Sequence, residues 1–261
     1  MSISISSISY CPVKSISFQT IKNCEIKKNI GIVGDRIFAF SKGLVINQAQ
    51  LFEKKLEERR GKWNNILTLK NTPSLNKYNF ILNKNELTLT QNENEILTIN
   101  SDEIDECSLL TNKILELENT LKKPLFLMKN KDIPFFDTSI SNKTLLNHSI
   151  SLINVRSVED FKNKTNKKIE TQRFRGNIYF DGVEAWEERN WIGKIIKINN
   201  ISFKVEKNIP RCVAINLKPN SDDNSLNLLQ NLKKIFNHFE MGVYLTALND
   251  GQIGIGDNIL I

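Results

Sequence analysis

Short stretches in which apolar and polar residues alternate dominate the sequence, and this period of two is typical of half-buried β-strands. The clearest pair lies at residues 87–89 and 96–99, joined by the polar loop 91–94, and is expected to form a hairpin. Asn199-Asn200 and Asp250-Gly251 also predict hairpin turns between apolar stretches. Other strands are predicted at 3–5, 18–26, 36–40, 44–46, 66–69, 78–82, 125–128, 178–180, 195–198, 201–205, 213–217, 243–247 and 253–255.

One long segment follows the helical period instead. Apolar side chains recur there at spacings of three and four, which predicts an amphipathic helix: Ile104, Cys107, Leu110, Ile114, Leu117 and Leu121. Ser101 is expected to cap its N-terminus, and Pro124 is expected to stop it. We place a domain boundary after this helix. It divides the chain into an N-terminal β domain of residues 1–123 and a second domain of residues 124–261.

The balance of elements predicts a mainly-β fold, with two β-barrel lobes and a few peripheral helices. Two further helices are expected, one starting at Ser157 and one carrying the apolar residues Leu228, Leu232 and Phe236 on one face. Strands and helices do not alternate as they do in Rossmann or TIM architectures. The glycine-rich motifs of dinucleotide and P-loop sites do not occur.

Composition narrows the possible functions. Lys and Arg number 36 against 29 Asp and Glu, a net charge of +7, but no run of five basic residues occurs, and nucleic-acid binding is not expected. The 2 histidines, and 4 cysteines without C-x-x-C spacing, exclude a zinc ribbon or an iron–sulfur cluster. The N-terminus does not resemble a signal peptide and no apolar run could cross a bilayer. We therefore expect a cytoplasmic protein without membrane association.

Four cationic side chains stand beside small or turn residues at the ends of predicted strands: Lys14, Arg36, Arg175 and Arg211. In such positions long side chains reach into a cleft between lobes, and guanidinium groups bind phosphate oxygens bidentately. Arg211 also directly precedes Cys212, and a neighbouring cation favours the thiolate, the form that binds metals. Each residue alone has an ordinary structural interpretation, such as a surface lysine or a buried inert thiol. Together they predict a site for an anionic cofactor with a sulfur-bound metal.

The ordered set of motifs resembles the MOSC family of molybdenum-cofactor proteins with its N-terminal β-barrel domain. The resemblance is greatest to the mitochondrial amidoxime-reducing component and its bacterial relatives. The matching segments extend over nearly the whole chain: Tyr-Cys-Pro-Val-Lys-Ser at 10–15, Gly-Asp-Arg at 34–36, Val-Ile-Asn-Gln-Ala-Gln at 45–50, Ser-Leu-Ile-Asn-Val-Arg-Ser-Val at 151–158, Arg-Phe-Arg-Gly-Asn-Ile-Tyr-Phe-Asp-Gly at 173–182, Ala-Trp-Glu-Glu at 185–188, Arg-Cys at 211–212 and Gly-Val-Tyr at 242–244.

This resemblance implies roles for individual residues. Cys212 would coordinate molybdenum, and Cys212 and Asp137 would be catalytic. The cofactor-binding residues that it implies are Lys14, Ser15, Arg36, Thr138, Ser139, Arg175, Asn177, Arg211, Cys212 and Tyr244. Asp137-Thr138-Ser139 matches a family motif beside the metal, but the extra residues 140–146 follow it. An alternative register places Asn147 and His148 in that role. Lys218 stands before Pro219, where the family often has an acidic residue.

The implied function is that of a molybdenum-cofactor oxidoreductase that reduces N-hydroxylated compounds, namely hydroxylamines, amidoximes and N-hydroxylated bases, independently of pyridoxal phosphate. Because the chain has no iron–sulfur or flavin motif, electrons would come from a separate protein, which could be a flavoprotein reductase, a ferredoxin or a cytochrome b5-like protein. A monomer is expected. The alternative is a non-catalytic cofactor carrier or a sulfur-transfer module that uses Cys212 as the sulfur acceptor.

Overall fold

The computed structural model describes residues 2–16, 18–141 and 146–261. Its strands are β1 Ser4–Tyr10, β2 Gln19–Ile21, β3 Asn23–Lys27, β4 Gly31–Ile32, β5 Phe38–Phe40, β6 Tyr78–Asn83, β7 Glu86–Gln91, β8 Asn94–Asn100, β9 Leu127–Lys129, β10 Ile150–Asn154, β11 Ile178–Asp181, β12 Ile195–Ile198, β13 Ile201–Pro210, β14 Glu240–Ala247, β15 Gly251–Gly254 and β16 Ile259–Leu260. Its helices are α1 Ile46–Lys54, α2 Leu56–Arg59, α3 Ile104–Leu117, α4 Asp137–Ile140, α5 Val155–Thr165 and α6 Leu228–Phe236. Short 3₁₀ helices are η1 Trp63–Asn65, η2 Pro73–Lys77, η3 Thr171–Phe174, η4 Glu187–Trp191 and η5 Val213–Asn216.

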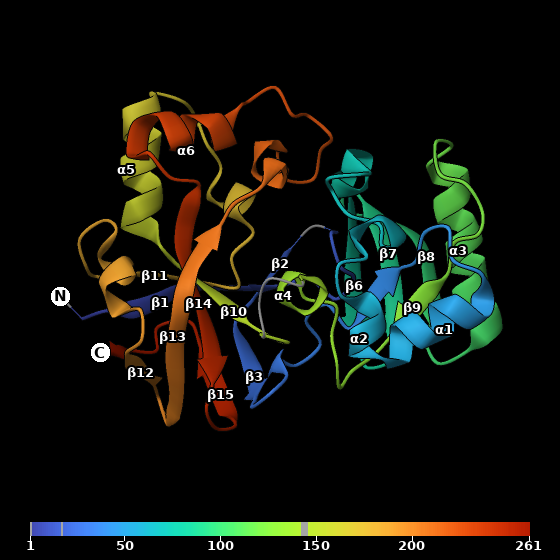
Figure 1. Cartoon of the computed structure of the whole chain (residues 1–261), viewed down its shortest axis with the longest axis horizontal. Coiled ribbons are helices and arrows are strands. Elements are labelled where there is room, and N and C mark those ends of the chain that lie inside the picture. The colour runs from blue at the N-terminus through green and yellow to red at the C-terminus, as the bar shows by residue number, and fades with distance from the viewer. Residues whose placement is uncertain (1, 17, 142–145) are drawn as a thin grey trace.

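A large, curved sheet forms one lobe, with strand order β16-β12-β13-β14-β10-β11-β1-β2 (Figure 1). Neighbouring strands are antiparallel except β10 and β11, which run parallel. Alternate residues such as Leu152, Val243 and Leu245 are fully buried on one face, as a period of two requires. The helices α5 and α6 pack together at one end of the sheet, and they bury Phe161 and Leu232 there.

The predicted mainly-β class is confirmed, with several sheets and few helices. The described strands form no closed barrel, and this corrects the predicted barrel lobes, because the large sheet ends at β2 and β16. Its curvature still brings the ends together, since Ser4 bridges to Asn258 and the Ile259 N–H donates to the Ile3 carbonyl at 2.8 Å. One edge of β1 is thus shared between β2 and residues 256–259, so no continuous ladder closes.

The smaller lobe contains the sheet β6-β7-β8, the pair β5-β9 and helix α3, which packs on β8 and β9. The predicted hairpin at 87–99 is confirmed as β7-β8. Helix α3 is also confirmed, but Glu103 rather than Ser101 is its N-cap, and it ends at Leu117. Ile104 is exposed, so the buried stripe begins at Leu110.

Two local predictions in the larger lobe were wrong, although the hairpin at Asn199-Asn200 is confirmed as β12-β13. The turn at Asp250-Gly251 leads into β15, but β15 pairs with β3 and not with β14. Residues 213–217 hold the 3₁₀ helix η5 instead of a strand. A short apolar run does not distinguish these two conformations, because either can bury it.

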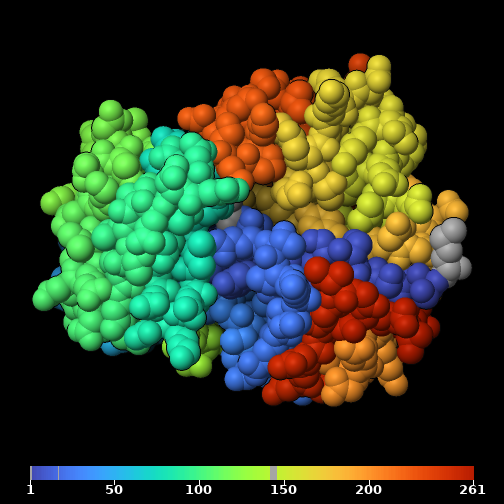
Figure 2. Space-filling view, turned by 180° about the vertical axis from the view of Figure 1, so that it is seen from behind, coloured from blue at the N-terminus to red at the C-terminus, as the bar shows by residue number. Residues whose placement is uncertain are grey.

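The N-terminal residues cross between the lobes. Strands β1 and β2 belong to the large sheet, while Phe38–Phe40 pairs with β9 in the smaller lobe. Figure 2 shows these first residues, in blue, between the green smaller lobe and the red C-terminal residues. The boundary near residue 123 remains a prediction, and hydrogen bonding between strands extends across it. None of the helices in the described residues is long and apolar enough to span a membrane.

Gly242 provides a test of the contact between β14 and β10. Its φ is +75°, and a Cβ there would lie 2.5 Å from the Leu152 carbonyl oxygen. We expect Gly242→Ala to lower the free energy of unfolding by about 2–4 kcal/mol, through left-handed strain and overpacking together. Urea unfolding measures this difference. Gly43→Ala is the matched control, because its φ is +69° but nothing lies within 4 Å. Equal losses for both variants would contradict the close contact.

Candidate functional site

A cavity of about 280 Å³ lies where the two lobes meet. Its walls come from segments that are far apart in the sequence: the turn after β1, the turn after β4, helix α4, the end of η3, and the end of β13 with η5. Nine of the predicted site residues line it: Lys14, Ser15, Arg36, Asp137, Thr138, Arg175, Arg211, Cys212 and Tyr244. The remaining two, Ser139 and Asn177, do not.

Three of these residues hold a backbone conformation that is uncommon outside glycine. Ser15, Arg36 and Arg175 have φ values of 68°, 55° and 50°. Left-handed conformations cost a non-glycine residue about 1–2 kcal/mol, and such strain clusters at functional sites. At each of these positions the strained turn presents the side chain to the cavity.

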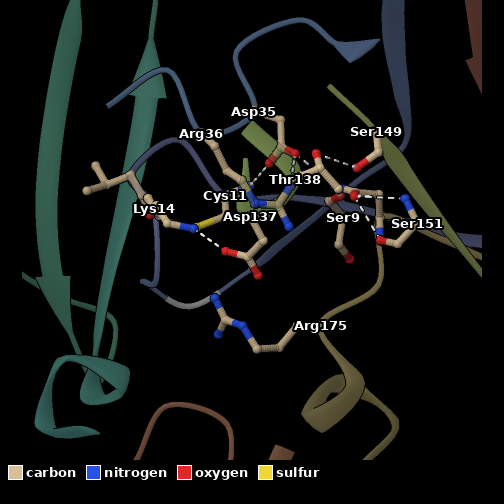
Figure 3. Close-up of polar contacts among 12 residues, drawn as sticks. Ser9, Cys11, Lys14, Asp35, Arg36, Asp137, Thr138, Ser149, Ser151 and Arg175 are labelled. Atoms are coloured by element: carbon tan, nitrogen blue, oxygen red, sulfur yellow. Dashed lines mark hydrogen bonds and ion pairs between the residues drawn. The ribbon is translucent and has the colours of Figure 1, made fainter. Parts of the chain in front are cut away.

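Lys14 and Asp137 form an ion pair across the cavity, drawn in Figure 3. The Lys14 side chain is 3% exposed, whereas that of Asp137 is 64% exposed and faces the cavity. Burial in the site would raise the pKa of Asp137, but the attraction of Lys14, Arg36 and Arg175 outweighs it and lowers the pKa to about 2. Asp137 is therefore a fixed carboxylate at neutral pH.

Asp35 anchors the arginine that follows it. Its carboxylate is buried, pairs with the Arg36 guanidinium and accepts hydrogen bonds from the Cys11 backbone N–H at 2.8 Å and Asn177 Nδ2 at 3.1 Å (Figure 3). Asn177 also bonds Ser151, through Oδ1 and through its backbone N–H. Asn177 thus acts behind the cavity wall, where it holds Asp35, and the network is buried except for the Arg36 side chain, which is 17% exposed.

The other two arginines are held by the backbone. Arg211 donates to the carbonyls of Phe174, at 2.7 Å, and Met241, from Nε at 2.9 Å. Arg175 donates to the Ile16 carbonyl at 2.7 Å and lies 4.9 Å from the centre of the Phe18 ring. Burial lowers the pKa of both guanidinium groups. Burying a positive charge costs free energy, and a bound anionic group would offset this cost.

Cys212 lies at the end of β13, as the residue that precedes η5, and it is half-buried. All four cysteines are described, and of these Cys212 alone lines the cavity. Cys11 and Cys24 are buried, and burial raises the pKa of both thiols, that of Cys24 to about 12. Within the described chain no cluster of three His, Cys, Asp or Glu side chains could hold a metal ion by itself. A metal at Cys212 would need further ligands that the described residues do not supply.

The two alternative registers of the Asp-Thr-Ser segment differ in whether their residues line the cavity. Asp137 and Thr138 line the cavity, and Thr138 Oγ1 lies 3.3 Å from Ser149 Oγ. Ser139 points away and donates to the Phe136 carbonyl at 2.7 Å. Asn147 and His148 lie outside the lining, with Asn147 accepting a bond from Arg60. Of the extra residues 140–146, those numbered 142–145 lie outside the described residues.

The cavity also contains residues that the sequence did not single out. Trp63 forms part of the wall, and the ammonium groups of Lys14 and Lys70 lie 5.7 Å and 5.6 Å from its ring centre. Ser151 and Lys207 line it as well. Ser151 begins the matching segment 151–158 but was given no role there, and no local motif marks Trp63 or Lys207, because only the fold brings them to the cavity.

Tyr244, on β14, gives the cavity a neutral polar group. Burial, with Asp137 nearby, raises its pKa to about 12. Its hydroxyl keeps the proton at neutral pH and can donate a hydrogen bond into the cavity.

Part of the sequence matches a known protein family. Residues 139–260 match the model of the MOSC domain. This match covers a little under half of the chain, in its C-terminal part. MOSC domains are associated with binding of the molybdenum cofactor. Arg175, Arg211, Cys212 and Tyr244 lie inside the matched MOSC residues, whereas Lys14, Ser15 and Arg36 come from outside them.

Two solved structures are similar to the chain. YiiM from Geobacillus stearothermophilus is 16% identical with a TM-score of 0.35, over 42% of this chain and 52% of that one. The chain thus spans about half the length of YiiM. The YuaD protein from Bacillus subtilis is 10% identical with a TM-score of 0.45, over 99% of this chain and 94% of that one. None of the curated proteins matches the sequence.

The Lys14–Asp137 pair generates a prediction about pH. The Asp137 pKa falls from an ordinary 3.8 to about 2 on folding, so its stabilisation is present above pH 4 and is lost as the pH falls to 2. Since the side chain is largely exposed, we expect Asp137→Asn to cost no more than about 1 kcal/mol at pH 6.

Urea unfolding of both proteins between pH 6 and pH 2 tests this. The gap between wild type and Asp137→Asn should close over the lower two pH units. Asp132→Asn, at an exposed carboxylate outside the cavity, should stay within about 0.5 kcal/mol of wild type. A gap that does not change with pH would contradict the ion pair.

Proposed function

We propose that this protein is a molybdenum-cofactor oxidoreductase that reduces N-hydroxylated compounds, namely hydroxylamines, amidoximes and N-hydroxylated bases. One observation carries the proposal. Four strongly basic side chains and one thiol converge from four segments on one cavity, which the residues matched to the MOSC domain help to line: Lys14, Arg36, Arg175, Arg211 and Cys212.

The donor groups fit an anionic pterin cofactor with a phosphate. Among the bonds of the described residues, the Arg36 guanidinium donates only to Asp35 and the Arg175 guanidinium only to the Ile16 carbonyl. Each guanidinium has five N–H donors, so most of them are available to phosphate oxygens. Asp137 is the one carboxylate in the lining. The cavity therefore has a clear excess of positive charge for a polyanionic ligand.

Roles for the chain's own residues follow from this chemistry. Arg36, Arg175 and Arg211 would hold the phosphate, Cys212 would supply a sulfur ligand, and Ser15, Thr138 and Tyr244 would make polar contacts. When bound, the cofactor supplies two-electron oxygen-atom chemistry. Asp137, with its pKa of about 2, keeps Lys14 in place and cannot donate a proton at neutral pH. The Tyr244 hydroxyl can donate a hydrogen bond to the substrate.

The reaction balances as R–NHOH plus two electrons and two protons, which yields R–NH₂ and water. The electrons would come from a separate donor protein, such as a flavoprotein reductase, a ferredoxin or a cytochrome b5-like protein. We further propose that the protein works as a monomer in the cytoplasm.

Cys212→Ala is expected to abolish turnover while leaving cofactor in place, because the arginines, and not the thiol, would hold the organic part. Reduction of benzamidoxime by the holoprotein with reduced methyl viologen measures turnover, and mass spectrometry measures bound molybdenum. Turnover should fall to the background rate.

Cys107→Ala is the control, since this half-buried thiol belongs to helix α3 in the smaller lobe. It should retain wild-type turnover. Persistent turnover in Cys212→Ala would exclude the sulfur ligand. Wild-type protein that holds cofactor but reduces no hydroxylamine or amidoxime would favour the carrier alternative.

Arg175→Ala tests the phosphate contact. A charge-assisted hydrogen bond is typically worth about 1.5–3 kcal/mol, so cofactor affinity should fall by about 10- to 100-fold. The ratio of molybdenum to protein after dialysis reports the loss. Arg156→Ala removes a surface ion pair with Asp181 and should leave the ratio unchanged. Equal ratios in all three proteins would argue against a phosphate at Arg175.

A further inference from the structure

A second cavity of about 370 Å³ lies beside the first one, on the other side of Arg175. It is lined by η3 and the residue before it, by the loop 217–220, and by Phe18, Thr20 and Asn76. Asn76 Nδ2 donates to the carbonyls of Lys218 and Ser221, at 2.6 Å and 2.7 Å. These bonds hold the loop against the smaller lobe, so the cavity is a defined feature of the fold.

Charge in this cavity is unbalanced. Its lining holds Arg173, Arg175 and Lys218 against a single carboxylate, Glu170. Glu170 already forms an ion pair, in which Arg173 Nε donates a hydrogen bond to its carboxylate at 2.6 Å. Burial would raise the pKa of Glu170, but the hydrogen bond and charge of Arg173, a backbone hydrogen bond and the charge of Lys218 together outweigh burial and lower it, so the Glu170–Arg173 pair stays ionised and neutral overall. Neither Arg175 nor Lys218 takes part in an ion pair of the described residues, so both can contact a bound anion directly, although Asp137 attracts Arg175 from the first cavity.

The wall between the two cavities is thin. Arg175 and Ala214 line both of them. Phe18 lines the second cavity, and its ring centre lies 4.9 Å from the Arg175 guanidinium and 5.0 Å from that of Arg36. A ligand in the second cavity would thus touch groups that also contact the cationic wall of the first.

We propose that the second cavity binds a small oxyanion, a phosphate- or carboxylate-bearing molecule, between Lys218 and Arg175. The apolar side chains of Phe18 and Leu217 limit its exposure to water, and the amides of Gln172 and Asn220 can donate further hydrogen bonds. Because Arg175 is shared, occupancy of either cavity alters the affinity of the other by the same factor. This site does not depend on which reaction the first cavity supports.

Two lysines make a matched pair for the test. Lys218 lines the second cavity alone, and Lys207 lines the first cavity alone. The full-length protein and the variants Lys218→Glu and Lys207→Glu are titrated calorimetrically with inorganic phosphate, and separately with malonate, at constant ionic strength. Lys218→Gln removes the charge without reversing it, and thermal unfolding of each variant verifies the fold.

We expect one of the two anions to bind, with at least a tenfold weaker affinity in Lys218→Glu and less than a threefold change in Lys207→Glu. Tighter phosphate binding would assign a phosphoryl group, and tighter malonate binding a carboxylate. The proposal is overturned if neither anion binds to the wild-type protein. It is equally overturned if Lys207→Glu weakens binding as much as Lys218→Glu does, because the anion would then lie in the first cavity or bind by general charge attraction.

Discussion

The architecture depends on one buried carboxylate. Asp35 is 1% exposed, and three groups converge on it: the guanidinium of its neighbour Arg36 and, from distant segments, the Cys11 backbone N–H and the Asn177 amide. Burial raises its pKa even though these partners oppose the shift. A buried carboxylate without such partners would be far too costly, so the end of β1, the turn after β4 and the start of β11 must stay together.

Because Asp35 holds these segments together, the cavity is lined both by the residues matched to the MOSC domain and by the N-terminal segment. The MOSC residues supply Arg175, Arg211, Cys212 and Tyr244, while the N-terminal segment supplies Lys14, Ser15 and Arg36. The N-terminal residues reach the cavity because β1 is a strand of the larger sheet. Without that strand, the residues matched to the MOSC domain would lack half of the cationic wall of this cavity. The hydrogen bonds to Asp35 therefore both stabilise the fold and position the residues of the cavity.

Most of the predicted residues line the cavity, because lysines, arginines and a cysteine beside turn residues can be recognised in local motifs. The direction in which each side chain points could not be predicted in this way. Ser139 and Asn177 belong to the same motifs as their neighbours, but one turns back onto the Phe136 carbonyl and the other supports Asp35. The burial of Asp35 was also not predicted, because nothing in an Asp-Arg dipeptide distinguishes a surface position from a buried one.

The fold could be predicted at the level of class and single hairpins, where alternation and turn residues are local signals. Strand partners that are distant in sequence were not predictable: β1 joins β11, and β15 joins β3. For the same reason the sequence did not show that the sheet curves almost into a barrel, or that Trp63 reaches the cavity.

X-ray absorption spectroscopy at the molybdenum edge would show whether Cys212 binds the metal. We expect the wild-type holoprotein to have one more sulfur ligand to molybdenum than the Cys212→Ser variant at equal cofactor content. An identical sulfur count in the two proteins, or wild-type protein that takes up no molybdenum, would contradict it.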